Sequence, residues 1–275
     1  MQSKVQIKAL IRFSYLSEGG FAISNMAHGD LEKYLYDPER LEKRFLLFEK
    51  LTLPSLIRQT DSNFKLGILI ASSFPPKSLL RLKELVAEYE NFKVIQLPTM
   101  IHIRAIYQAY DLLETAPDTT HIASFRLDDD DAVHKDIIAC TRDHAETIVR
   151  VGKNKTNPFI ISFNRGFYFR TKTEKTDFSL GEFYEKTPVA AGMTLVSPIG
   201  NRCNVFRRNH RKANQFFNCY SDMTRPMFIR TFHGENDSGV IPTGREGDLS
   251  PEEVKKILLD GFGQRMENLE TIFGA

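Results

Sequence analysis

The sequence predicts an α/β protein with a mostly parallel central sheet and helices on both faces. Short apolar runs at 4–13, 64–71, 92–97 and 121–127 alternate with segments of helical spacing along the first half of the 275 residues. Strands that alternate with helices in this way form parallel sheets, because each helix returns the chain to the same end of the sheet. An acidic run follows the last of these strands, where open α/β sheets place their ligands.

The composition is that of an ordinary globular chain. It is 41% hydrophobic and 26% charged, with a formal net charge of +2, so we expect no nucleic-acid partner. We also expect no signal peptide and no transmembrane segment, because no apolar run is long enough. Three cysteines without a CxxC pair predict neither a disulfide framework nor a zinc site. A cytoplasmic protein is the expectation, and peripheral membrane contact is left open.

The first half should contain helices between its strands and one long connection. The polar, glycine-containing segment 14–37 is long enough to be functional. Pro38 suits the first turn of a helix over 39–50, and Pro54 should divide that helix from a short second one. Two further helices with amphipathic spacing are predicted over 78–89 and 101–113.

The second half has shorter apolar runs. Strands over 158–163 and 166–169 are predicted to be joined by a tight turn, with later strands over 190–196 and 227–232. A helix over 251–262 should begin at Ser250, with Glu253 in the capping-box position. A basic segment between these strands is either a solvated face or a site for phosphate or an acidic acceptor; it holds Arg207, Arg208, His210, Arg211 and Lys212.

The run Asp128–Asp131 is the strongest candidate site. Four adjacent carboxylates repel one another unless a cation lies among them, and hard oxygen ligands suit Mn²⁺ or Mg²⁺. Acidic runs also occur as solvated loops or helix starts, with Asp130 or Asp131 as the cap. The apolar strand before the run and the helical segment after it favour a dication site for a substrate that carries phosphates.

Several stretches carry a resemblance to a known family. Leu53–Thr60 with the following strand, Arg104–Tyr110 and Leu127–Asp131 resemble the nucleotide-sugar-binding half of family 2-like glycosyltransferases, which have the GT-A fold and a D-x-D-D motif. Over most of its length the chain resembles the rhamnosyltransferase family of bacterial glycosyltransferases. The stretches that match are Arg12–Ser14, Asp37–Leu41, Leu53–Leu56, Gln59–Asp61, Arg126–Ala132 and His233–Asn236.

The resemblance implies one GT-A-like domain over 1–275. Its nucleotide-sugar-binding half would span 1–135, and its acceptor half with a C-terminal helix would span 136–275. The implied activity is transfer of rhamnose or another hexose, with inversion, from a nucleoside-diphosphate sugar to a glycan, lipid-linked or other acceptor, as in polysaccharide biosynthesis. A divalent metal would stabilise the charge on the leaving diphosphate.

The resemblance also implies roles for individual residues. Asp128, Asp130 and His233 would hold Mn²⁺ or Mg²⁺, although a lone histidine is often structural. Arg126 would meet the diphosphate bidentately or pair with the neighbouring aspartates. The residues expected to bind the donor are Arg12, Phe13, Ser72, Arg104, Arg126, Asp128, Asp129, Asn236 and Ser238.

Two departures from the family 2 pattern limit the inference. Ala71–Ser73 stands where many of these enzymes carry aspartates that contact the nucleotide, so no base preference is implied. The Glu-Asp pair that often supplies the catalytic base is also missing. Asp237, beside His233, is our candidate for the base that deprotonates the acceptor, and the alternatives are Glu182, Glu185 and Asp222.

Two other functions fit the same residues. A nucleotidyltransferase or phosphohydrolase also uses carboxylates and a metal, although its acids are usually spread over several strands. A protein that binds nucleotides or carbohydrates without turnover would keep the fold alone.

Overall fold

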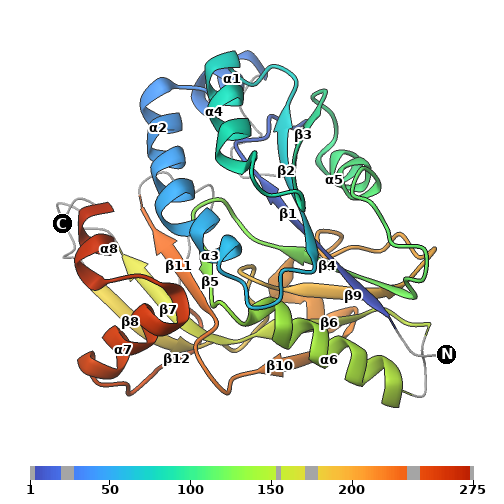
Figure 1. The fold of residues 1–275 in the computed structure, drawn as a ribbon, viewed down its shortest axis with the longest axis vertical. Helices are drawn as coiled ribbons and strands as arrows, with labels where there is room; N and C mark the ends of the chain where they lie inside the picture. The colour runs from blue at the N-terminus through green and yellow to red at the C-terminus, as the bar shows by residue number, and fades with distance from the viewer. Residues whose placement is uncertain (1–3, 20–27, 153–155, 171–178, 234–241, 273–275) are drawn as a thin grey trace.

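A computed structural model describes residues 4–19, 28–152, 156–170, 179–233 and 242–272, and the statements below concern these residues. Its main feature is a seven-stranded sheet in the order β10-β6-β9-β4-β1-β2-β3 (Figure 1). The strands of this sheet are β1 (Val5–Arg12), β2 (Phe64–Ala71), β3 (Phe92–Leu97), β4 (His121–Arg126), β6 (Phe159–Phe163), β9 (Thr194–Pro198) and β10 (Asn218–Asp222).

Four neighbouring strands of this sheet, β4, β1, β2 and β3, are parallel throughout. Their carboxyl ends therefore lie at one edge, which carries Arg12, Ser72 and the acidic run. β9 is antiparallel to both β4 and β6, and β10 is parallel to β6. The predicted α/β class with a mostly parallel central sheet is confirmed.

Helices cover both faces of the parallel strands, as expected. The helices are α1 (His28–Leu35), α2 (Pro38–Leu47), α3 (Leu53–Ile57), α4 (Pro76–Val86), α5 (His102–Asp111) and α6 (Ile137–Val151). Successive residues of β1 face opposite sides of the sheet. Ile7 and Ile11 pack in a core with α2, α4 and α6, whereas Leu10 packs in a second core with α1 and α5 (Figure 1).

The helix that begins at Pro38 is longer than predicted. Asp37 caps it by accepting a hydrogen bond from the Arg40 N–H at 3.0 Å, and Pro38 lies in its first turn. Pro54 does not divide it, because a π-helical turn over Phe48–Thr52 joins α2 to α3. In that turn Leu53 donates to the carbonyl of Phe48, and the wider spacing accommodates a proline that has no N–H of its own.

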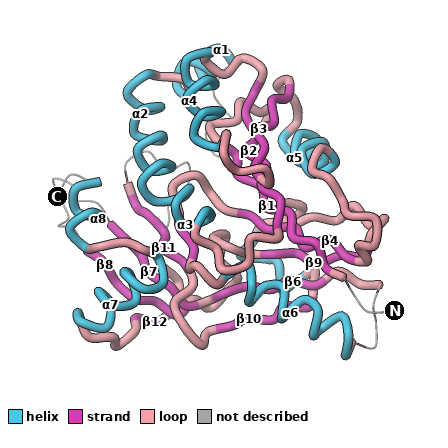
Figure 2. Tube along the Cα trace, in the orientation of Figure 1, coloured by secondary structure: helices cyan, strands magenta, loops and turns pink. Residues whose placement is uncertain are grey.

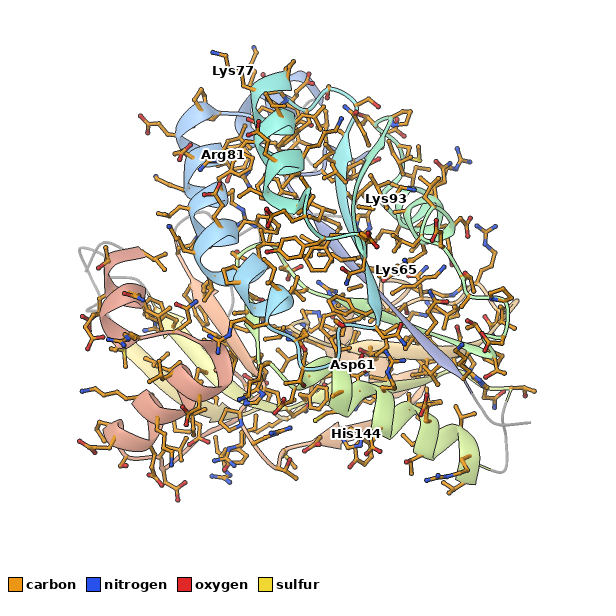
Figure 3. All side chains as sticks on the ribbon, viewed as in Figure 1. Asp61, Lys65, Lys77, Arg81, Lys93 and His144 are labelled. Carbon is orange, nitrogen blue, oxygen red and sulfur yellow. The ribbon has the colours of Figure 1, made fainter. Side chains whose placement is uncertain are left out.

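Arg81 ties α4 to the long helix. Its guanidinium group donates to Glu42 at 2.7 Å and to Glu49 at 2.6 Å, and its carbon lies 4.4 Å from the ring centre of Phe45 (Figure 3). The helix that begins at Pro38 and α4 together cover one face of the parallel strands.

The second half adds a five-stranded sheet that the sequence did not indicate, in the order β12-β8-β7-β11-β5. These strands are β5 (Ala132–Val133), β7 (Arg165–Arg170), β8 (Ser179–Tyr184), β11 (Phe228–Phe232) and β12 (Arg245–Glu246). Helices α7 (Pro251–Ile257) and α8 (Met266–Ile272) pack beside it (Figure 2). Ser250 and Glu253 form the predicted capping box, and the helix continues as a π turn over Leu258–Phe262.

The predicted hairpin at 164–166 is wrong. β6 and β7 belong to different sheets, and Asn164 lies at the crossing between them. Its backbone N–H donates to the backbone carbonyl of Asp222 at 2.9 Å. Its side-chain Nδ2 donates to the backbone carbonyl of Glu185 at 3.1 Å. Gly166 is needed for close packing, because a Cβ there would lie 2.6 Å from the ring of Phe228.

No helix in the described part of the chain has both the length and the apolar character needed to cross a bilayer.

Candidate functional site

The acidic run Asp128–Asp131 connects the two sheets. β4 ends at Arg126 in the large sheet, and β5 begins at Ala132 in the small one, where it pairs with β11. The run therefore lies at the carboxyl edge of the parallel strands, as the sequence predicted. Asp131 does not cap α6, since that helix begins at Ile137.

Each aspartate of the run contacts an arginine. Asp128 Oδ1 accepts from both Arg12 and Arg126, each at 3.3 Å. Arg44, on α2, donates to Asp129 and, at 3.0 Å, to Asp130. The guanidinium groups of the chain itself thus offset part of the repulsion expected within the run.

Asp131 contacts the small sheet. Its carboxylate accepts from Arg230 Nε at 3.4 Å and from the Thr231 N–H at 3.1 Å, both on β11. Thr231 Oγ1 also donates to the backbone carbonyl of Asp130 at 2.9 Å. These contacts fix the end of the run against β11.

The environment separates the protonation states of the aspartates. Burial opposes ionisation of Asp128, but Arg126 and Arg12 outweigh it and lower its pKa. For Asp130, burial is outweighed by Arg44 and by the hydrogen bond from His233, and the pKa falls to about 2. Burial raises the pKa of Asp131 to about 8 against the opposing charge of Arg230. Asp128 and Asp130 are therefore anionic at neutral pH, and Asp131 is harder to ionise than either of them.

Two of the three residues predicted to bind a metal lie together. His233 Nε2 and Asp130 Oδ2 are 3.0 Å apart. The Asp130 carboxylate is the ligand type that Mn²⁺ and Mg²⁺ prefer, so this residue would suit such an ion, and His233 would be the neighbouring ligand. Among the described side chains, no third carboxylate, imidazole or thiolate converges on them. Such ions commonly complete their shell with water and substrate phosphates.

The predicted donor-binding residues are spread along the same edge. The Asp128 side chain is 26% exposed, and Asp129 is buried on Arg44. Ser72 is exposed at the end of β2, and Arg104 is exposed in the first turn of α5. Asn236, Ser238 and the candidate base Asp237 lie outside the described residues.

Phe13 is placed differently from the other predicted donor ligands. Its side chain is 0% exposed and packs in the core with Phe45 and Phe48, at ring distances of 4.8 and 5.2 Å. The ring therefore supports the end of β1 from beneath and does not face a ligand at the edge.

The alternative bases all have partners within the fold. Glu182 pairs with Arg165 at 2.5 Å. Glu185 accepts from the hydroxyl groups of Tyr168 and Thr243, each at 2.6 Å. Asp222 lies 2.8 Å from His144 and also accepts from Thr224. These contacts give the three carboxylates structural roles.

Sequence reasoning missed several residues that complete the site. Arg44 and Arg230 hold the acidic run, and His102 Nε2 accepts from Arg12 at 2.7 Å. Phe206, from the segment that also carries the basic residues, lies against Arg12 and Arg126. The sequence carries no local signal for these contacts, since the partners lie on different elements. Within the basic segment, Arg207, Arg208 and Arg211 are exposed.

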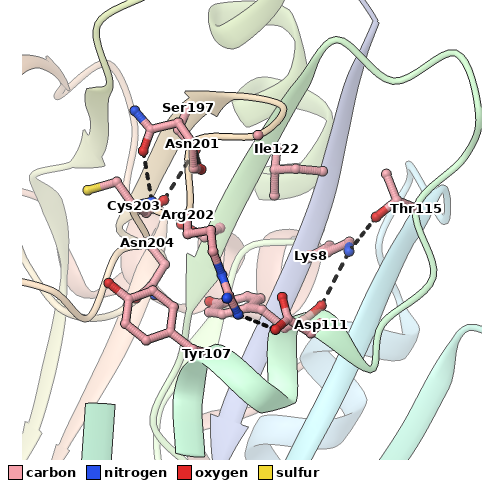
Figure 4. Close-up of a pocket in the computed structure, with 13 residues that line it drawn as sticks. Lys8, Tyr107, Asp111, Thr115, Ile122, Ser197, Asn201, Arg202, Cys203 and Asn204 are labelled. Atoms are coloured by element: carbon pink, nitrogen blue, oxygen red, sulfur yellow. Dashed lines mark hydrogen bonds and ion pairs between the residues drawn. The ribbon is translucent and has the colours of Figure 1, made fainter. Parts of the chain in front are cut away.

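A separate cavity of about 240 Å³ lies between α5, β1 and the loop 197–204 (Figure 4). Lys8 extends into it from β1, and Arg202 pairs with Asp111 there. The Lys8 ammonium group donates to the carbonyl of Leu113 at 2.6 Å and to Thr115 Oγ1 at 2.7 Å. Lys8 is thus occupied in closing the end of α5 and is not free for chemistry.

Comparisons with known proteins agree with the family that the sequence suggested. The family model described as "Putative rhamnosyl transferase" matches residues 6–245. Among curated proteins, none matches the chain.

Three solved structures show a weak likeness. S. aureus TarS 1-349 in complex with UDP-GlcNAc is 13% identical, with a TM-score of 0.42 over 98% of this chain and 70% of that one. The same protein in complex with UDP is 12% identical, with a TM-score of 0.41 over 98% and 69%. The WbbM bifunctional glycosyltransferase is 11% identical, with a TM-score of 0.26 over 60% and 23%. Likeness this weak identifies neither a ligand nor an activity.

The family match, in contrast, covers most of the chain and both sheets. The chain therefore belongs to the rhamnosyltransferase family, and it is a glycosyltransferase.

Proposed function

We propose that this glycosyltransferase transfers rhamnose or another hexose from a nucleoside-diphosphate sugar to a glycan or lipid-linked acceptor, with inversion and with Mn²⁺ or Mg²⁺. The observation that carries the proposal is the arrangement of Arg12 and Arg126, which both contact Asp128 Oδ1 at 3.3 Å at the edge of the sheet. Two guanidinium groups directed at one oxygen suit a diphosphate, whose oxygens can take the place of that carboxylate oxygen.

The donor would be bound by groups from three strand ends. Arg12 ends β1, Ser72 follows β2, and Arg126 with Asp128 ends β4. The Nε of Arg126 has no hydrogen-bond acceptor among the described residues, which leaves one buried donor for a phosphate oxygen. Both arginines would offset the negative charge that develops on the leaving diphosphate, where fixed charges contribute most to catalysis.

Asp130 and His233 are the residues that would hold the metal. A bound dication would act as a Lewis acid on the diphosphate. Arg44 keeps Asp130 ionised and in place from the opposite side. We assign to Asp237 the role of the base that deprotonates the acceptor hydroxyl, because it is close in the sequence to His233.

Variants of the Asp130–His233 pair test the proposal. His233→Asn and Asp130→Asn should each lower donor turnover about 100-fold or more, as loss of a group that stabilises developing charge commonly does. Turnover is measured as release of the nucleotide from a panel of UDP-, GDP-, dTDP- and CMP-sugars, which is the nucleoside diphosphate for the first three and CMP for the last, with Mn²⁺ and with excess EDTA. Full activity of both variants, or of the wild type in EDTA, would contradict the metal assignment.

The pair of His144 and Asp222 provides a matched control. It is also a histidine–carboxylate pair, with His144 Nε2 2.8 Å from Asp222 Oδ2. It joins α6 to β10, away from the acidic run. His144→Asn should leave turnover close to the wild-type rate. A panel of nucleoside triphosphates in the same assay would reveal a nucleotidyltransferase or phosphohydrolase instead.

A further inference from the structure

We infer that Phe206 is a positioning residue for the donor diphosphate, because its ring holds the guanidinium groups of Arg12 and Arg126 side by side. The inference rests on the proposed function, since the anion that the two arginines would receive is the diphosphate of the sugar donor. Phe206 itself would not touch the donor.

Both arginines lie against the same ring. The Cζ atoms of Arg126 and Arg12 are 4.9 and 5.2 Å from the ring centre of Phe206. Two like charges at such short range repel each other, and the electron-rich face of an aromatic ring attracts both. Together with Asp128 Oδ1, which accepts from both arginines at 3.3 Å, the ring thus offsets the repulsion between the two guanidinium groups.

A tight turn fixes the position of the ring. The Arg207 N–H donates to the carbonyl of Asn204 at 3.1 Å, and the Phe206 N–H donates to Asn204 Oδ1 at 3.0 Å. Between them Val205 is buried, and its N–H donates to Ser124 Oγ on β4 at 3.0 Å. The turn is therefore anchored to β4, the strand that ends at Arg126. This anchor fixes the position of the Phe206 ring relative to that arginine.

The remaining neighbours of Phe206 support the same role. The ring of His102 meets it nearly edge-on, at 6.3 Å and 78°, while accepting from Arg12 at 2.7 Å. Burial and the nearby charges of Arg12 and Arg126 lower the pKa of His102 to about 3, so the imidazole is neutral at neutral pH and can accept. Arg12 thus has a fixed position before any ligand binds.

The aromatic contact has a consequence that an ion pair would not have. A ring face attracts a guanidinium group without accepting all of its N–H donors, which point outward in the guanidinium plane. A carboxylate in the same place would accept those donors and compete with the diphosphate. Phe206 therefore orients the two arginines without itself accepting from their N–H groups.

Substitution at Phe206 separates orientation from simple packing. Phe206→Leu keeps an apolar side chain but removes the ring, and Phe206→Tyr keeps the ring. Phe206→Leu should bind inorganic pyrophosphate with Mn²⁺ about 5- to 30-fold more weakly by calorimetry, and Phe206→Tyr should bind it like the wild type. In donor turnover, Phe206→Leu should lower kcat/KM by at least a similar factor, because the two arginines both bind the diphosphate and offset the charge that develops on it.

A second stacked pair serves as the control. Phe216 is 50% exposed and lies 4.2 Å from the Cζ of Arg208 in the same basic segment. Phe216→Leu should leave pyrophosphate binding and donor kcat/KM unchanged. Thermal unfolding of all three variants confirms that each is folded at the assay temperature.

The outcomes distinguish the inference from the proposed function. Wild-type affinity in Phe206→Leu, an equal loss in Phe206→Tyr, or a kcat/KM that Phe206→Leu leaves unchanged would each overturn the role of the ring. If the wild type binds neither pyrophosphate nor any nucleoside-diphosphate sugar, the proposed function fails, and the inference fails with it. Donor turnover by the wild type with no effect of Phe206→Leu would remove the inference alone.

Discussion

Arg44 is the cation that Asp129 and Asp130 share within the buried part of the acidic run. It donates to Asp129 and to Asp130, and all three side chains are buried. A buried carboxylate without a partner is strongly destabilising, whereas one with a fixed guanidinium group is tolerated. Asp129 and Asp130 thus share the guanidinium group of Arg44.

Replacement of Arg44 by Met should destabilise the protein by about 3–5 kcal/mol, because it leaves Asp129 buried without its cation. The double variant Arg44→Met/Asp129→Asn should recover part of this loss, because the uncompensated charge is gone. Urea unfolding at neutral pH measures both values. A single variant within about 0.5 kcal/mol of the wild type would contradict this account, since that is the usual effect of a surface substitution.

At the residue scale, the sequence located the acidic run but not its partners. Four adjacent aspartates after an apolar strand stand out in any linear reading. Arg44 lies 85 residues before Asp129, and Arg230 lies 99 residues after Asp131. Each is one of many arginines on an amphipathic or apolar segment, so only the fold shows which of them meets a carboxylate.

At the element scale, Lys8 closes the carboxyl end of α5. The helix ends at Asp111, and the ammonium group of Lys8 donates to the carbonyls of Tyr110 and Leu113 at 3.3 and 2.6 Å. The last carbonyls of a helix have no partner within it, and a cation there also interacts favourably with the helix dipole. Burial lowers the pKa of Lys8, and the charge of Asp111 opposes this shift.

Lys8→Met should therefore lower the stability by about 1–3 kcal/mol, because buried carbonyls lose their donor while most of the packing volume is kept. Hydrogen exchange should show the loss in the last turn of α5. Lys93→Met is the matched control, because Lys93 also donates to a carbonyl of this region, that of Leu112 at 3.1 Å, but is exposed (Figure 3). Equal effects of the two substitutions would show that burial of Lys8 is unimportant.

The elements that the sequence predicted well are those with a repeated apolar pattern. β1 to β4, α4 and α5 have such patterns and were found close to their predicted bounds, whereas α1 was missed within the segment 14–37, which was predicted to be a connection. The small sheet was missed because its strands find partners far away in the sequence: β11 lies between β7 and the two-residue β5. Pro54 predicts a helix break, and the structure differs because a π turn, which leaves no signal in the sequence, carries the helix past this proline.

At the scale of the whole molecule, the acidic run joins the two sheets, and this arrangement could not be foreseen. The rule that ligands bind at strand ends gave the place of the run in the large sheet. That β5 then enters a second sheet depends on pairing of Phe228 with Val133 and of Ile229 with Ala132. Such pairing follows from the packing of the complete chain and not from any local pattern.

The response of the whole fold to acid should depend on buried histidines. His134 directly follows β5, where its Nδ1 accepts from the Asp136 N–H at 3.1 Å and its ring meets Phe262 edge-on at 5.5 Å. Burial, followed by the charge of Arg225, lowers the pKa of His134 to about 4, while Asp136 opposes the shift and Lys135 adds to it. The imidazole is therefore neutral in the fold and accepts a hydrogen bond.

This shift determines the sign of the pH dependence. Below the ordinary pKa of about 6.5 the unfolded chain binds a proton at His134 that the folded chain does not, so stability falls as the pH drops from about 6.5 to about 4. The loss should be roughly 1–3 kcal/mol for this residue. His134→Asn loses the ring contact with Phe262, so it should be less stable than the wild type at pH 7. It keeps an acceptor for the Asp136 N–H but cannot titrate, so it should lose less stability than the wild type between pH 7 and pH 4.5. Urea unfolding of both proteins at the two pH values tests this, and an identical loss in both would show that His134 does not contribute to acid sensitivity.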